Sequence, residues 1–154
     1  MTDRLFHIIM TALACCMLAC SCSPSASDYS SFTDLPARGW NYGDTVCFQI
    51  AADSIRPRSI SVAIRHNDDY EYRNLWLEVS YTDADSTLRR DTVSMELADV
   101  YGHWLGQGLG TSYQIQKKVS DSVRLLPGAA VMVRHVMRTD TLRGLRQIGV
   151  ETTP

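Results

Sequence analysis

The chain has 154 residues, of which 45% are hydrophobic and 21% charged, and its formal net charge at pH 7 is −2. These values describe one globular domain and exclude a disordered chain or a two-domain enzyme. The only lysines are Lys117 and Lys118, and the arginines are scattered along the chain, so we expect no nucleic-acid partner.

The N-terminal segment has the pattern of a secretory signal. A basic residue, Arg4, precedes roughly 15 apolar residues that run to Ala19, which is short for a membrane span. The small residues that follow stand directly before Cys20 and Cys22, as in the signals of bacterial lipoproteins, where the peptide is cut before a cysteine that receives acyl chains such as palmitate. Residues 1–21 are therefore interpreted as a lipoprotein signal peptide with cleavage before Cys20 or Cys22. An ordinary signal peptide with incidental cysteines is the alternative.

The preceding triplet Met-Leu-Ala favours Cys20 over Cys22 as the acylated residue. After cleavage Cys47 remains, joined by Cys22 if Cys20 is acylated, and this excludes a disulfide framework. Because Cys47 lies in a strand-like run with no motif around it, we expect a packed, inert thiol.

Small polar residues, mainly serines, follow the cysteines, so residues 22–38 are predicted to be a flexible tether. The pattern then changes to alternation of apolar and polar residues, which predicts strands in a domain spanning residues 39–154. The segments are Thr45–Ile50, Ile60–Arg65, Leu75–Thr82, Thr92–Leu97, Tyr113–Val119, Val131–Arg138 and Gln147–Thr152. With turn signals between them and no helical periodicity, they predict an all-β fold, an antiparallel, jelly-roll-like β-sandwich of about seven or eight strands.

No segment carries a convincing catalytic or metal-binding pattern. Asp83, Asp85 and Thr87 match the D-x-D-x-T loop of haloacid-dehalogenase-like phosphatases, but they stand between two alternating segments and are better interpreted as a hairpin turn. His66, His103 and His135 are far apart in sequence and belong to no ligand motif. We therefore expect no enzyme, no cofactor, no metal and no small-molecule substrate.

Two stretches stand out as candidate contact surfaces. One holds the alternating glycines Gly106, Gly108 and Gly110 after Trp104, which suit a close internal approach of two backbones, a phosphate-binding nest or a flat surface for a partner. The other is an aromatic-rich segment with Tyr70, Tyr72 and Trp76. Exposed aromatic residues form protein–protein hot spots and glycan platforms, and the alternative is that these residues cap the core.

Two blocks resemble a known family. They are N-x-x-Y-x-Y-x-N-L, from Asn67 to Leu75, and E-L-A-D-x-x-G-x-W-L-G-x-G-L-G, from Glu96 to Gly110. Together with the order of the segments around them, these blocks resemble the gliding motility lipoprotein GldH family of Bacteroidetes. The resemblance covers nearly the whole chain.

The resemblance implies a lipoprotein of the gliding machinery, which in that phylum is linked to the type IX protein secretion apparatus. It brings no catalytic residue and no cofactor with it. Family-like spacing to Tyr29 favours Cys22 as the acylated residue, against the triplet argument. Surface-exposed lipoproteins of that phylum tend to carry acidic residues just after the cysteine, and the serines found here instead favour the periplasmic side. We expect an outer-membrane protein that faces the periplasm.

The functional prediction is a non-enzymatic, membrane-anchored scaffold that binds other envelope proteins. Its predicted partner-binding residues are Tyr70, Tyr72, Asn74, Trp76, Trp104, Gly106, Gly108 and Gly110. The alternative is a carbohydrate-binding sandwich in which Trp76 and Tyr70 form a stacking platform.

Overall fold

The computed structural model of the chain describes residues 29–51 and 54–154. The predicted signal peptide and both candidate acylation sites, Cys20 and Cys22, lie outside the described residues. No helix in the described ranges is long and apolar enough to cross a membrane.

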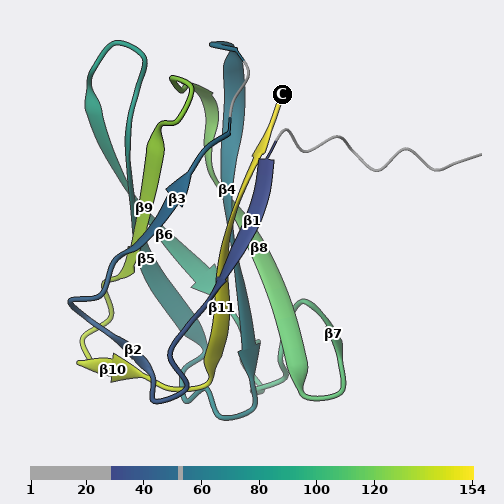
Figure 1. Cartoon of the computed structure of the whole chain (residues 1–154). Helices are drawn as coiled ribbons and strands as arrows, with labels where there is room; N and C mark the ends of the chain where they lie inside the picture. Colours follow the sequence, from purple (N-terminus) through teal and green to yellow (C-terminus); the bar gives the residue numbers. More distant parts are fainter. Residues whose placement is uncertain (1–28, 52–53) are drawn as a thin grey trace, which may run out of the picture.

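The described residues form an all-β fold of antiparallel sheets, as predicted (Figure 1). The first sheet has the strand order β1 (Tyr29–Asp34), β11 (Leu145–Thr153), β4 (Pro57–Asn67), β8 (Ser112–Arg124) and β7 (Gln107–Leu109). The second has the order β3 (Val46–Gln49), β9 (Ala130–His135), β5 (Asn74–Thr82) and β6 (Leu88–Glu96). A two-stranded pair, β10 (Thr141–Leu142) with β2 (Trp40–Asn41), lies at one end of the sandwich.

Alternating apolar side chains of the two sheets meet in the core. Ile60, Val62 and Ile64 of β4 are fully buried, and so are Leu75 and Leu77 of β5. Since successive side chains of a strand point to opposite faces, this burial leaves the intervening residues of β5 on the outer face of the second sheet. Trp76 is accordingly 43% exposed.

All seven predicted strand segments form strands, and the turn between β5 and β6 is the predicted hairpin. It is closed by a hydrogen bond from the Asp83 amide to the Thr87 carbonyl, 2.9 Å long. The sequence analysis missed the short strands β2, β7 and β10, and it extended the segment that forms β9 by three residues too many. Two- and three-residue strands are too short to show an alternating pattern.

The start of the domain needs a correction, because part of the predicted tether is a strand. β1 pairs with β11 from Tyr29 to Asp34, within the 22–38 segment. The ring of Phe32 lies so close to Gly149 that a Cβ added there would be 2.6 Å from the ring, and the Arg65 guanidinium stacks 4.2 Å from the ring centroid. The domain thus includes β1, and its described part starts ten residues before the predicted boundary at residue 39.

The expectation for Cys47 is also wrong, since its side chain is exposed. Phe48 and Ile50 point into the core, so Cys47 lies on the outer side of β3, opposite Met132 of β9. The expectation of a packed thiol followed from the apolar residues around Cys47. The alternation of the same segment, which points Phe48 and Ile50 inward, places the Cys47 thiol on the outer face.

Removing a core side chain of β5 should lower stability far more than removing an outward-facing side chain of the paired strand β6. We expect Leu77→Ala to lower the free energy of unfolding by about 2–5 kcal/mol, because a fully buried side chain would leave a cavity. Thr92→Ala, an exposed position on the adjoining strand, should change it by less than about 0.5 kcal/mol. Urea denaturation followed by tryptophan fluorescence measures both, and similar losses in the two variants would contradict the assigned register.

Candidate functional site

Aromatic rings from three segments meet at the end of the sandwich that holds the β4–β5 connection. The buried ring of His66, at the end of β4, lies with its centroid 6.0 Å from that of Tyr70, 4.7 Å from Trp104 and 5.4 Å from Tyr113. We call these four residues the aromatic cluster. It brings two of the predicted contact residues together through a histidine that the sequence analysis did not assign to the site.

Tyr70 belongs to the core and not to a contact surface. Its side chain is 3% exposed, its hydroxyl donates a hydrogen bond of 2.9 Å to the Asn74 carbonyl, and burial raises the pKa of the phenol. Trp104 is half-buried against the same core. We therefore remove Tyr70 from the predicted partner-binding set, because no partner could touch it.

Two buried histidines are held neutral by their surroundings. Burial lowers the pKa of His66, and the Asn67 carbonyl and Asp68 oppose this only in part. Burial likewise lowers the pKa of His135, whose ring meets the edges or faces of Trp40 and Tyr42 at centroid distances of 5.4 and 5.7 Å. Aromatic packing of this kind suits an uncharged imidazole.

The glycine-rich segment is explained first by internal packing. A Cβ at Gly106 would overlap the main-chain oxygen of Gln114, and one at Gly108 would overlap that of Ser112. Gly110 lies in the following turn, where its φ of +65° favours glycine. The close approach of β7 to β8 requires the first two glycines, so a contact role for them is not needed to explain their presence.

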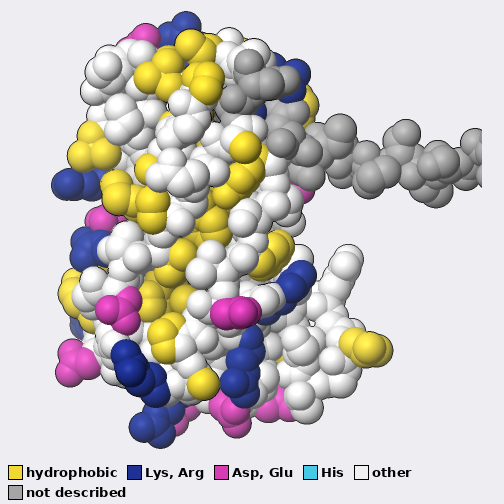
Figure 2. Space-filling model, viewed as in Figure 1, with side chains coloured by type: hydrophobic (Ala, Val, Ile, Leu, Met, Phe, Trp, Pro, Cys, Tyr) yellow, Lys and Arg dark blue, Asp and Glu magenta, His cyan; other side chains and the backbone are white. Residues whose placement is uncertain are grey.

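The hairpin that these glycines permit carries an unusually exposed apolar side chain. Leu109 at the end of β7 is 93% exposed. Figure 2 shows hydrophobic atoms at the outer edge of the projecting part of the molecule where Figure 1 places β7.

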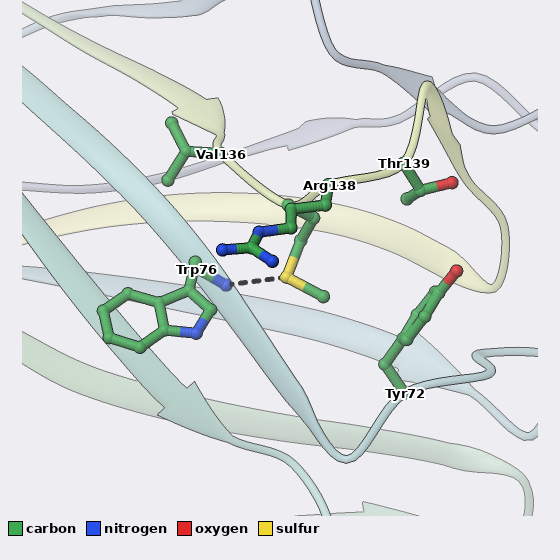
Figure 3. A pocket seen from close by; sticks show the side chains of 6 residues that line it. Tyr72, Trp76, Val136, Arg138 and Thr139 are labelled. Atoms are coloured by element: carbon green, nitrogen blue, oxygen red, sulfur yellow. Dashed lines mark hydrogen bonds between the residues drawn. The ribbon is translucent and has the colours of Figure 1, made fainter.

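Tyr72 and Trp76 border a hollow of about 540 Å³, which we call the Trp76 hollow (Figure 3). Trp76 is 43% exposed and Tyr72 36%. The remaining lining residues are Val136, Met137, Arg138 and Thr139, from the segment that follows β9. These four residues were not predicted as part of a site, because the predicted strand ran on to Arg138 and Thr139 follows it.

The Trp76 hollow adjoins two others through shared lining residues. Tyr72 also lines a hollow of about 430 Å³ together with Asn74 and Glu96. Glu96 in turn lines a third, of about 530 Å³, with Leu105 and Gly106. Four of the eight predicted residues therefore line this series of three hollows: Tyr72, Asn74, Trp76 and Gly106. Trp104, Gly108 and Gly110 line none of the three.

The other candidate chemistry does not assemble. Asp83 and Asp85 occupy the β5–β6 turn, where Asp85 pairs with Arg124 at 3.1 Å. Within residues 29–51 and 54–154, no group of three or more His, Cys, Asp or Glu side chains could hold a metal ion.

Residues 27–152 match the family described as GldH lipoprotein. A curated relative from Christiangramia forsetii, described as a gliding motility lipoprotein GldH homolog, is 31% identical over 72 residues, which are 46% of this chain and 44% of the relative. The matched part thus spans less than half the length of that relative.

Two solved structures show a distant likeness. Dimeric latent PorU from Porphyromonas gingivalis is 15% identical, with a TM-score of 0.33 over 87% of this chain and 13% of that one. The VP2 subviral particle of infectious bursal disease virus is 12% identical, with a TM-score of 0.30 over 84% and 31%. At such low TM-scores neither likeness carries an argument.

The neutral histidines predict a pH dependence of stability. The pKa values of both histidines lie below the ordinary 6.5. Below about pH 6.5 these side chains are therefore protonated more in the unfolded chain than in the folded protein, and the stability of the folded protein falls as the pH is lowered. We expect the free energy of unfolding in urea to decrease between about pH 7 and pH 5, and to decrease less steeply in His66→Phe. His103→Gln, which changes an exposed ring, is the control, and an unchanged slope in His66→Phe would contradict the assignment.

Proposed function

The chain belongs to the GldH lipoprotein family, and from this premise we propose that it is a non-enzymatic scaffold of the cell envelope. In this proposal acyl chains on Cys20 or Cys22 hold it in the outer membrane on the periplasmic side. Its domain binds other proteins of the gliding machinery and of the linked type IX secretion apparatus.

The observation that carries this proposal is the position of the exposed aromatic hollows relative to the chain's entry into the domain. Tyr29 begins β1 opposite Thr152, near the C-terminus, whereas His66 of the aromatic cluster pairs with Leu145 at the other end of β11. The β4–β5 connection, which carries Tyr72 of the Trp76 hollow, lies at that same end (Figure 1). The nine residues of β11 separate these ends by roughly 30 Å. An anchored domain of this kind would hold its hollows away from its own membrane.

Tethering explains how such a surface could work with modest contacts. Cys22 precedes Tyr29 by seven residues, which reach about 25 Å when fully extended. A protein confined so close to a membrane meets partners in that membrane at a high effective concentration, so a small interface suffices. The carbohydrate-binding alternative is weakened because Tyr70, half of its stacking platform, is buried.

Anchoring can be tested with an alkyne analogue of palmitate supplied to growing cells. We expect the protein to be labelled, and Cys20→Ala or Cys22→Ala, whichever removes the acylated thiol, to abolish the label and leave the signal peptide uncleaved. Cys47→Ala is the matched control and should be labelled like the wild type. Labelling that persists when both Cys20 and Cys22 are replaced would refute the anchor.

The contact surface can be tested by substituting its most exposed aromatic side chain in the membrane-anchored protein. We expect Trp76→Ala to reduce co-purification of cross-linked envelope proteins by at least about tenfold, as the loss of an aromatic hot spot does. Met132→Ala is the control, because Met132 is 38% exposed on the same sheet face but lines none of the three hollows. Equal recovery with Trp76→Ala and the wild type, at equal abundance, would place the surface elsewhere.

A further inference from the structure

We propose that the Trp76 hollow binds an extended peptide segment of a partner protein, and that Arg138 holds a carboxylate of that segment. This inference rests on the proposed scaffold function and names the chemistry of its partner. Three features of the hollow support it: a lining segment, residues 137–139, that makes no backbone–backbone hydrogen bond to the described residues, two aromatic walls, and an arginine with no ion pair among those residues.

The main chain lining the hollow has left its sheet. After His135 the chain makes one further ladder-like bond, from the Val136 amide to the Trp76 carbonyl at 2.9 Å. The Trp76 amide then donates to the thioether of Met137 at 3.3 Å, a weak acceptor where a strand would offer a carbonyl (Figure 3).

Among the described residues, no backbone–backbone hydrogen bond outside the strands involves residues 137–139. Residues 137–139 border the hollow, and 138 and 139 lie in a bend, so their peptide groups are placed to bond individually with a bound peptide and not as a continuous ladder.

The side walls suit the side chains of such a peptide. Figure 3 shows the rings of Trp76 and Tyr72 on opposite sides of the hollow, with Arg138 between them. Val136 and Met137 add apolar surface. Aromatic and thioether groups contact aliphatic side chains favourably, and the main chain of residues 137–139, which makes no backbone–backbone bond to the described residues, offers amides and carbonyls that a peptide can pair with. This lining favours a peptide over a glycan.

Arg138 supplies charge selectivity. Arg134 pairs with Glu78 at 2.9 Å and Arg146 with Asp69 at 3.4 Å, but Arg138 has no ion pair or side-chain hydrogen bond to any residue in the described part of the chain. Its exposed guanidinium is therefore ready to bind a carboxylate. The adjoining hollow beyond Tyr72 is lined by Glu71 and Glu96 together with Arg73. Two carboxylates against one guanidinium leave that hollow negative, so the acidic part of the peptide is favoured at Arg138.

The test is selection of a displayed library of random ten-residue peptides on the full chain in detergent micelles, with peptides that bind Trp76→Ala subtracted. We expect enrichment of sequences that combine an acidic residue with bulky aliphatic neighbours. A synthetic consensus peptide should bind Arg138→Gln about tenfold more weakly than the wild type, as expected for the loss of a charge-assisted bond. Arg90→Gln, an exposed arginine on the outer face of the same sheet, is the matched control and should bind normally.

The inference is overturned if no peptide is enriched over Trp76→Ala, if the enriched peptides are basic, or if Arg138→Gln binds like the wild type. Binding of an oligouronate in place of peptides, lost in Trp76→Ala, would also overturn it and identify a glycan site. If one of these results is obtained but Trp76→Ala still loses its envelope partners in cells, the peptide inference fails and the scaffold proposal stands. If the peptide binds as expected but Trp76→Ala keeps all its partners in cells, only the scaffold proposal fails.

Discussion

The pairing of β4 on both of its edges is the constraint on which the exposed end of the domain depends. His66 stands opposite Leu145 of β11 on one side and Tyr113 of β8 on the other, so two neighbouring strands set the position of its main chain. Trp104 and Tyr70 pack against the ring of His66, and the connections that carry them take their positions from it. A rigid sheet thus sets the geometry of loops that would otherwise be free to vary.

The sequence analysis succeeded where burial has a clear period. The β5 segment alternates between buried and more exposed residues from Leu75 to Val79, and for that reason both its strand assignment and the outward position of Trp76 could be predicted. The glycine segment was harder, because three physical causes can place alternating glycines in a β-rich chain. Internal packing is favoured because the main-chain oxygens of Gln114 and Ser112 lie against Gly106 and Gly108. The positions of these oxygens depend on how β7 packs on β8, which the sequence alone does not show.

The remaining errors have a common physical origin. β1 was assigned to the tether because its serines resemble a spacer, although pairing with β11 and the contact of Phe32 with Gly149 order it. The lining of the Trp76 hollow was missed because Val136 to Arg138 continue an apolar run while the chain departs from β5. In both places tertiary contacts overrode local composition, and no window of a few residues reveals them.

The antiparallel pairing of β1 with β11 has a mechanical consequence. A pull between the membrane and a partner at the far end of the domain would run along the length of β1, from Tyr29 toward the aromatic cluster. All six residue pairs that join β1 to β11 would then bear the force together, in shear, instead of opening one after another as in a zipper. Such a strand would be a strong point of attachment for a domain that is held from its N-terminal side.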